Sequence, residues 1–254
     1  MIPWLESHLV QLGPVVVRTW GTLVATGFLI GTAIASRRAK SKGLERILLW
    51  DIAFWAFISA MVGSRIFHVL FYDFSWYLAH PWDAIDPTKP GFSIAGGILF
   101  GALAVWVFTK IKKLDLAAYA DAVAWGLPWG IGIGRIGCFL IHDHPGIATS
   151  LPIGVRYPDG IARHDLGLEL SLVGFAIGIL FLIADRMHLV KTPGGWVGLF
   201  LVLDGLSRFF LDFLRIADVR YGSLTPTQWL SLPLMAFGAF LLLRRTVDTK
   251  PKTG

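Results

Sequence analysis

The chain has 254 residues, of which 55% are hydrophobic and only 16% are charged, and its mean hydropathy is +0.63. A soluble protein of this length carries more charge, so the composition excludes an ordinary soluble domain and favours a membrane protein. The net charge of +6 comes without a basic stripe interleaved with aromatic residues, so no nucleic-acid partner is predicted, and the single cysteine, Cys138, excludes an internal disulfide.

Seven apolar segments follow one another along the chain, each close to the roughly 20 residues that a helix needs to cross a membrane. The first residues, MIPWLESHLV, lack the basic region of a cleaved signal peptide, so we expect the first segment to be retained. The predicted fold is all-α, a polytopic membrane protein with about seven transmembrane helices in a single transmembrane domain over residues 1–254. The segments cover residues 19–36, 47–72, 90–109, 117–141, 167–184, 195–214 and 221–243.

Lys and Arg residues accumulate in alternate connections, and cytoplasmic loops carry such an excess. The rich connections are 37–46, 110–113, 186–191 and the C-terminal 244–252. The opposite connections hold only Lys89, Arg156, Arg163, Arg215 and Arg220. This bias predicts an N-terminus outside the membrane and a cytoplasmic C-terminus.

Ionisable residues inside apolar segments are costly and indicate function. Four stand out: Arg65, Arg135, Arg208 and Asp212. Asp204, Arg208, Asp212 and Arg215 share one helix face, so a ladder of ion pairs is one interpretation for the two acids. Arg65 and Arg135 have no obvious nearby acid. Because guanidinium groups bind phosphate through a planar fork of donors, the arginines predict a water-filled cavity for the headgroup of an anionic membrane phospholipid.

The segment 130–146, GIGIGRIGCFLIHDHPG, combines glycines with polar residues. Its glycines are typical of close helix packing, and no strand–turn–helix context supports a dinucleotide site. For the cluster His142, Asp143 and His144, a general base, a metal site and an ordinary polar loop stay open. Alternate positions are poor metal-ligand spacing on a helix and no third ligand is apparent, so neither a metal nor a cofactor is predicted. A packing role is favoured over a nucleophilic one for Cys138.

These residues resemble the prolipoprotein diacylglyceryl transferase family over most of the chain. The block from Gly132 to Gly146 resembles the family signature Gly-x-Gly-Arg-x-Gly-Asn-Phe-x-Asn-Gly-Glu-x-x-Gly, most strongly between Gly132 and Phe139. Further similar blocks are Gly63-Ser64-Arg65, residues 92–97, Arg163-His164 with Glu169, residues 208–215 and residues 225–231.

The resemblance implies an enzyme of the bacterial inner membrane. Such an enzyme moves a diacylglyceryl group from phosphatidylglycerol to the lipobox cysteine of a prolipoprotein signal peptide and releases glycerol phosphate. Arg135 and Arg208 would hold the phosphate, and a nearby base would help form the thiolate. The implied catalytic residues are Arg135, Arg208, Asp143 and His142, and the implied lipid-binding residues are Arg65, Gly134, Gly137, Cys138, Gly146 and Asp212.

The sequence departs from the family pattern at five positions. Ala95 replaces the motif histidine, and the other departures are Cys138 for asparagine, Asp143 and Asp212 for glutamate, and Trp20 for tyrosine. We therefore hypothesise that His142 or His144 replaces the missing base. Two alternatives to the transferase follow: a non-catalytic phospholipid-binding paralogue, and a related transferase with a different acceptor.

Overall fold

The computed structural model describes residues 1–12, 15–72, 74–86, 91–216 and 220–244. The loop charges Lys89, Arg245, Lys250 and Lys252 of the orientation argument lie outside these residues. The chain divides into two compact units, Met1–Arg38 with Ala120–Gly254, and Ala39–Tyr119. That residues 1–254 form a single transmembrane domain stays a prediction.

Each of the seven predicted spans coincides with a helix. The helices are α1 Thr19–Ser41, α2 Arg46–Phe71, α4 Ile94–Ile111, α5 Leu116–Ile141, α6 Leu166–Arg186, α7 Gly195–Leu211 and α8 Pro226–Leu243. Within the described residues, α1, α2, α5, α6 and α8 are long and apolar enough to cross a membrane, and α4 holds a shorter apolar stretch, Gly96–Ile111. The protein is therefore a polytopic membrane protein, whereas the number of seven spans and the orientation stay predictions.

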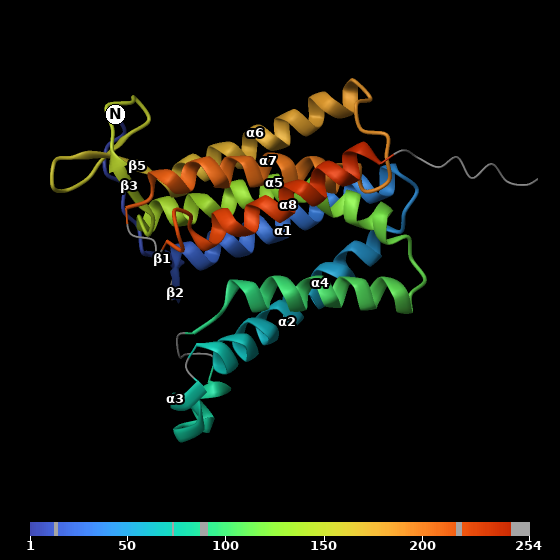
Figure 1. The fold of residues 1–254 in the computed structure, drawn as a ribbon, viewed down its shortest axis with the longest axis horizontal. Helices are drawn as coiled ribbons and strands as arrows, with labels where there is room; N and C mark the ends of the chain where they lie inside the picture. Colours follow the sequence, from blue (N-terminus) through green and yellow to red (C-terminus); the bar gives the residue numbers. More distant parts are fainter. Residues whose placement is uncertain (13–14, 73, 87–90, 217–219, 245–254) are drawn as a thin grey trace, which may run out of the picture. The chain divides into compact units, whose positions relative to one another are not determined.

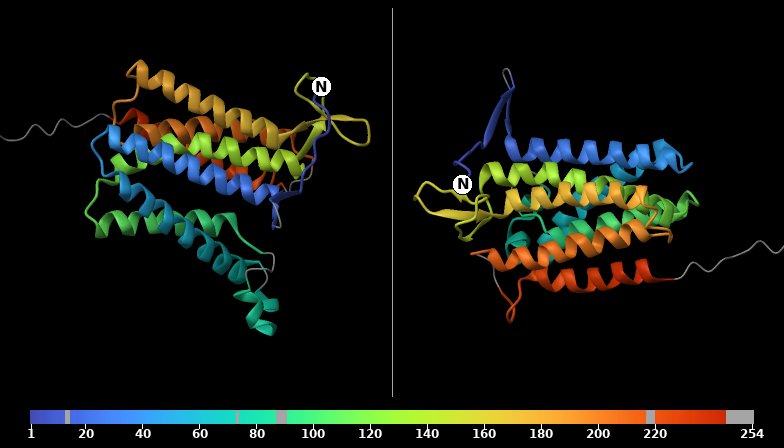
Figure 2. Two further views of the ribbon diagram at one scale, coloured as in Figure 1. Left: turned by 180° about the vertical axis from the view of Figure 1, so that it is seen from behind. Right: turned by 90° about the horizontal axis from the view of Figure 1, so that it is seen from above.

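In the first unit, α1 and α5 to α8 run side by side (Figures 1 and 2). Glycines let α5 approach both of its neighbours. A Cβ on Gly126 would lie 2.0 Å from the carbonyl oxygen of Gly31 in α1, and a Cβ on Gly174 in α6 would lie 2.8 Å from the backbone nitrogen of Gly132. Ser171 of α6 donates a hydrogen bond to the Gly132 carbonyl at 2.7 Å. The glycine-rich segment thus packs α5 between α1 and α6, as small residues do in membrane helices.

Asp121 fixes α7 to α5. Its carboxylate accepts hydrogen bonds from the backbone N–H groups of Gly194, Trp196 and Val197 at 2.8, 3.0 and 3.1 Å. These N–H groups have no partner within α7, and the positive end of the helix dipole adds to the attraction. Helix capping therefore accounts for Asp121, an acid inside an apolar segment. The same contacts hold α5, which carries Arg135, to α7, which carries Arg208.

Two small sheets accompany the helices. The hairpin β1 Leu9–Leu12 and β2 Val15–Arg18 precedes α1, and an antiparallel sheet of order β3-β5-β4 lies between α5 and α6. Its strands are β3 Pro145–Ala148, β4 Val155–Arg156 and β5 Ala162–Asp165. The all-α prediction missed both sheets, because strands of two to four residues leave no clear alternation in the sequence.

The second unit consists of α2 and α4, with the short helices α3 Phe74–Ala79 and η1 Pro81–Ala84 after α2. A Cβ on Gly96 would lie 2.5 Å from the Gly63 carbonyl oxygen, and the backbone N–H of Ser93 donates to the Ser64 carbonyl at 3.1 Å. Two of the family-like blocks therefore pack directly on each other. Ala95 lies in α4 of this unit, and its side chain is outside the described part.

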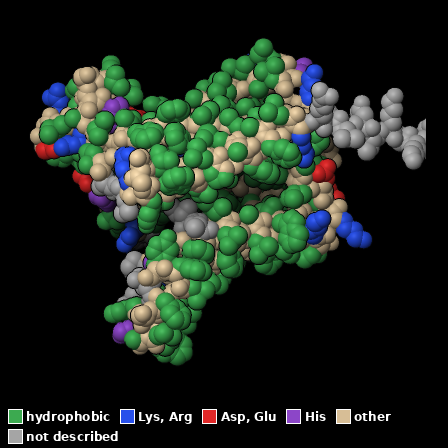
Figure 3. All heavy atoms as spheres, in the orientation of Figure 1, with side chains coloured by type: hydrophobic (Ala, Val, Ile, Leu, Met, Phe, Trp, Pro, Cys, Tyr) green, Lys and Arg blue, Asp and Glu red, His purple; other side chains and the backbone are tan. Residues whose placement is uncertain are grey.

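Large apolar side chains remain exposed along the helices. Phe54, Trp55 and Phe57 of α2 are about half exposed. Figure 3 shows hydrophobic side chains along the helices and Lys and Arg side chains toward their ends. Extended apolar surface of this kind is what a lipid-facing helix presents.

Candidate active site

Arg135 is half-buried near the C-terminal end of α5. Its Nη1 lies 3.9 Å from Sγ of Cys138, which is its only hydrogen-bond partner within the described part of the chain. It forms no ion pair there, although the charges of Arg208 and Arg215 repel it and the charge of Asp143 attracts it. The structure thus places a guanidinium group beside a thiol and in the electrostatic field of two further arginines, with its own charge incompletely neutralised.

Arg208 and Asp212 each take part in an ion pair, as the ladder interpretation expects for the two acids, but the described residues show two separate pairs and none between Arg208 and Asp212. Nε of Arg208 lies 2.6 Å from Asp204, and Nε of Arg215 lies 3.5 Å from Asp212. Asp212 is only 4% exposed and accepts a hydrogen bond from the Thr225 hydroxyl at 2.6 Å. Among the described residues, the two terminal nitrogens of Arg208 make no hydrogen bond, so its fork of donors is open to an anion.

Arg65, the third predicted phosphate ligand, belongs to the second unit. Its guanidinium group is buried and donates to backbone carbonyl oxygens: Nε to Ala84 at 3.0 Å, Nη1 to Gly91 at 2.8 Å and Nη2 to Asp83 at 2.5 Å. Through these hydrogen bonds, Arg65 of α2 fixes the positions of Asp83, Ala84 and Gly91. The geometry favours a structural role for Arg65 over the predicted contact with lipid.

His142 is buried directly after α5, in the left-handed backbone region with φ 48°. Its Nδ1 lies 2.6 Å from Asp165 and its Nε2 lies 3.0 Å from the Leu5 carbonyl oxygen. Trp4 stacks on the ring at 3.6 Å between centroids. Because both ring nitrogens are occupied, the geometry favours a structural role for His142 over the predicted proton transfer.

Tyr157 completes the surroundings of Asp165. Its hydroxyl donates to Oδ2 of Asp165 at 3.0 Å, the same oxygen that contacts His142. Burial, together with the negative charge of Asp165, raises the pKa of Tyr157 well above its ordinary value. The hydroxyl therefore stays protonated and keeps donating to this carboxylate over the physiological range.

Asp143 and His144 follow His142, and the charge of Asp143 acts on Arg135. Oδ1 of Asp143 and Nδ1 of His144 are in direct contact, and both side chains are partly exposed. The donor atoms of Cys138, Asp143 and His144 all lie within 4.8 Å of one another. The structure thus supplies the third donor that the sequence pattern lacked, because the end of α5 folds Asp143 and His144 back toward Cys138.

His164 and Glu169 form a second histidine–carboxylate pair that the site prediction did not include. Nδ1 of His164 lies 2.5 Å from Oε1 of Glu169, which is 7% exposed. The other oxygen, Oε2, has no hydrogen-bond partner among the described residues. The only sequence signal for this pair was the resemblance of residues 163–169 to a family block.

The predicted lipid-binding glycines line close backbone contacts. A Cβ on Gly137 would lie 3.1 Å from Cα of Trp20, and one on Gly134 would lie 3.8 Å from Cα of Val24, both in α1. A Cβ on Gly146 in β3 would lie 2.8 Å from Cβ of His164. Gly137 and Gly146 thus permit close approach of neighbouring elements, which is the packing alternative for glycine, whereas a Cβ at Gly134 would make only an ordinary van der Waals contact.

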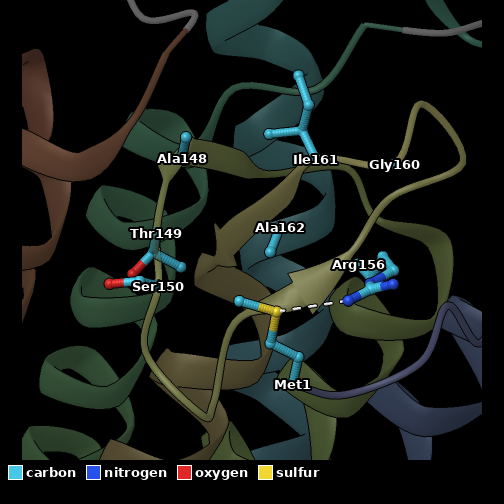
Figure 4. Close-up of a pocket in the computed structure, with 8 residues that line it drawn as sticks. All are labelled: Met1, Ala148, Thr149, Ser150, Arg156, Gly160, Ile161 and Ala162. Carbon is cyan, nitrogen blue, oxygen red and sulfur yellow. Dashed lines mark hydrogen bonds between the residues drawn. The ribbon is translucent and has the colours of Figure 1, made fainter.

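Two cavities lie in the first unit. One, of about 420 Å³, sits on the three-stranded sheet (Figure 4) and is lined by Met1, Ala148, Thr149, Ser150, Arg156, Gly160, Ile161 and Ala162. The other, of about 370 Å³, is lined by His8, Leu9, Arg18, Trp20 and Ile141. None of the predicted site residues lines either one. Trp20 lines the second cavity, and its Cα would lie 3.1 Å from a Cβ on Gly137.

The fold and the site define a polytopic helical membrane protein with a half-buried cluster of arginines that suits an anion. Comparison with known proteins then gives the particular family. Residues 7–244 match the family described as prolipoprotein diacylglyceryl transferase, and the chain belongs to this family.

Three relatives illustrate the similarity, each named phosphatidylglycerol–prolipoprotein diacylglyceryl transferase. The protein from Photobacterium profundum is 33% identical over 99% of this chain and 97% of its own length. The one from Nitratidesulfovibrio vulgaris is 35% identical over 94% of each chain, and the one from Cupriavidus necator is 31% identical over 95% of this chain and 93% of its own length. The similarity therefore extends over nearly the whole length of this chain and of each of the three relatives.

Proposed function

We propose that this protein transfers a diacylglyceryl group from phosphatidylglycerol to the lipobox cysteine of a prolipoprotein signal peptide and releases glycerol phosphate. Its place is the bacterial inner membrane, with seven spans, the N-terminus outside and the C-terminus in the cytoplasm. The observation that carries the proposal is Arg135, a half-buried guanidinium group without an acidic partner in the described residues, inside the segment that resembles the family signature. Family membership and the names of the relatives support it.

The proposed role of the arginines follows from the charge changes of the reaction. The acceptor thiolate attacks the glyceryl carbon that bears the phosphate, so a C–S bond forms while the C–O bond to phosphate breaks. The phosphodiester carries one negative charge, and the leaving phosphate monoester carries two. Arg135 and Arg208 would bind the phosphate and stabilise the charge as it develops.

The base that forms the acceptor thiolate is proposed among the residues at the end of α5. His142 has both ring nitrogens engaged. His144 has only Nδ1 engaged with Asp143 in the described structure, which leaves Nε2 open to a substrate. We therefore place His144, oriented by Asp143, ahead of His142.

The test is a transfer assay with purified protein, phosphatidylglycerol and a lipobox peptide, which follows peptide mass and glycerol phosphate together. We expect Arg135→Ala to lower kcat/KM at least about 100-fold, the effect of removing a donor that stabilises transition-state charge. Arg163→Ala is the matched control, since Arg163 in β5 forms a salt bridge at 2.6 Å with Asp159, in the turn that precedes this strand. Equal activity of the two variants would contradict the proposal.

The same assay separates the alternatives. A non-catalytic paralogue, which the absence of the motif histidine at Ala95 favours, would bind phosphatidylglycerol without releasing glycerol phosphate. A transferase with another acceptor would consume the phospholipid and leave the peptide unmodified.

A further inference from the structure

Cys138, Asp143 and His144 bring three different metal-ligating groups together at the end of α5. A sulfur, a carboxylate oxygen and an imidazole nitrogen lie within 4.8 Å of one another. The cysteine is 7% exposed, whereas the side chains of His144 and Asp143 are 26% and 33% exposed. The cluster thus has a fixed inner donor and two outer donors that an ion can reach.

This set of donors suits Zn²⁺. Zinc binds cysteine sulfur at about 2.3 Å and histidine nitrogen and carboxylate oxygen at about 2.0–2.2 Å, and a tetrahedral site separates its donors by about 3.6 Å. The widest of the present donor separations, at most 4.8 Å, exceeds that value by about 1 Å, and the direct contact between Asp143 and His144 has to open. A change of side-chain rotamer at these two partly exposed residues can supply both movements. Three protein ligands also leave the fourth position open, the mark of a catalytic rather than a structural site.

We propose that Cys138, Asp143 and His144 bind a zinc ion whose fourth position takes the sulfur of the acceptor cysteine. The inference rests on the proposed function and deepens it. It explains how the acceptor thiolate forms in a chain where Ala95 replaces the motif histidine. A thiol that coordinates zinc loses its proton outright, so on this inference His144 and Asp143 serve as zinc ligands and replace the base that the proposed function places at His144. Two of the three ligands, Cys138 and Asp143, stand where the family signature has asparagine and glutamate.

The charges of the site support this assignment. Ionised Cys138 and Asp143 with neutral His144 carry two negative charges, which the ion neutralises. Arg135, whose Nη1 lies 3.9 Å from Sγ of Cys138, is then no longer attracted by a thiolate and keeps its charge for phosphate. Acceptor sulfur and phosphodiester are thereby held at neighbouring positions, as substitution at the glyceryl carbon requires.

The step is balanced without a redox partner. The acceptor thiol releases its proton to water on binding, and the sulfur donates an electron pair to the glyceryl carbon. The C–O bond breaks with its electron pair on the phosphate oxygen, so a neutral thioether and a phosphate monoester dianion result. The zinc ion is unchanged and its fourth position is vacated by the thioether, a weaker ligand than a thiolate.

The test uses Co²⁺ as a spectroscopic substitute for zinc in the full-length protein, purified in detergent and freed of metal with a chelator. We expect one bound cobalt per chain and a thiolate-to-cobalt absorption band in the near ultraviolet that is absent in Cys138→Ser. His144→Ala should weaken cobalt binding at least about tenfold, since it removes one of three ligands. His8→Ala is the control, because His8 is an exposed histidine paired with Glu6, and it should bind cobalt as the wild type does.

The acceptor is tested in the same spectrum. A lipobox peptide should intensify the band as a second thiolate binds, whereas the peptide with serine in place of its cysteine should not. Absence of the band, or a band unaffected by Cys138→Ser or by the lipobox peptide, would overturn the proposal. Transfer activity separates the two inferences: unchanged transfer by metal-free protein refutes the zinc site and leaves the proposed function standing, whereas the expected spectra without any lipidated peptide refute the function alone.

Discussion

Asp212 is a buried carboxylate with two partners, the Thr225 hydroxyl at 2.6 Å and Nε of Arg215 at 3.5 Å. Asp212→Ala should lower the free energy of unfolding by about 1–3 kcal/mol, because a buried hydroxyl and a guanidinium group lose their acceptor. Asp204→Ala is the comparison, since Asp204 is more exposed and pairs with Arg208 within one helix, and we expect about 1 kcal/mol or less. Thermal unfolding in detergent, followed by circular dichroism, measures both, and equal losses would show that the burial of Asp212 is unimportant.

Individual residues differ in how far the sequence could predict them. Arg135 and Arg208 stand out because a guanidinium group in an apolar segment is costly. Arg65 gives the same signal, yet it binds the carbonyl oxygens of Asp83, Ala84 and Gly91, which no pattern in the sequence brings to it. The role of His142 depends on Asp165, which lies 23 residues further along the chain. Charge in a hydrophobic segment therefore identifies important residues, but partners that are distant in sequence decide what they do.

The contact between α1 and α5 depends on glycine. Gly126→Ala should lower the free energy of unfolding by about 1–3 kcal/mol, because the new Cβ would lie 2.0 Å from a backbone oxygen of Gly31 and the helices would have to separate. Gly21→Ala in α1 is the matched control. No atom lies within 4 Å of a Cβ at that position, so we expect no loss of stability. Thermal unfolding of the two variants decides the matter; similar midpoints would mean that α1 and α5 are not closely packed.

The hydroxyl of Tyr157, which directly follows β4, donates to Asp165, the last residue of β5 before α6 begins. Because the pKa of Tyr157 is raised in the folded protein, its contribution to stability is fully present below the unfolded value of about 10 and is lost as the pH rises above it. The wild-type unfolding midpoint should therefore fall more steeply than that of Tyr157→Phe above about pH 10, whereas the two proteins should run parallel below about pH 9. Parallel slopes for the two proteins in the upper range as well would argue against the hydrogen bond.

At the scale of elements, the long helices were predictable and the sheets were not. Continuous apolar runs are long enough to identify each helix, and only the ends differ by several residues, as for α1, which continues to Ser41. The strands β3 to β5 gain their stability from pairing across the connection 142–165, a contact that no local signal marks. The same connection turns Asp143 and His144 toward Cys138, which is why the third donor of the cluster was missed.

For the whole molecule, the direction of the chain across the membrane rests on the positive charges of the loops. We predict that Lys42, between α1 and α2, faces the cytoplasm and that Ser150, between β3 and β4, faces the outside. Both residues are exposed in the structure, so a cysteine introduced at either position can react. The native Cys138 is buried and contributes little background.

The measurement is labelling of intact cells with a maleimide that cannot cross the inner membrane. Ser150→Cys should react at once, whereas Lys42→Cys should react only after the membrane has been permeabilised. The reverse pattern would invert the orientation and place the cluster of Arg135 and Cys138 on the cytoplasmic side. Because a lipobox cysteine must be modified where the secreted precursor emerges, that result would also remove the acceptor from the proposed reaction. The topology thus tests the function independently of any active-site variant.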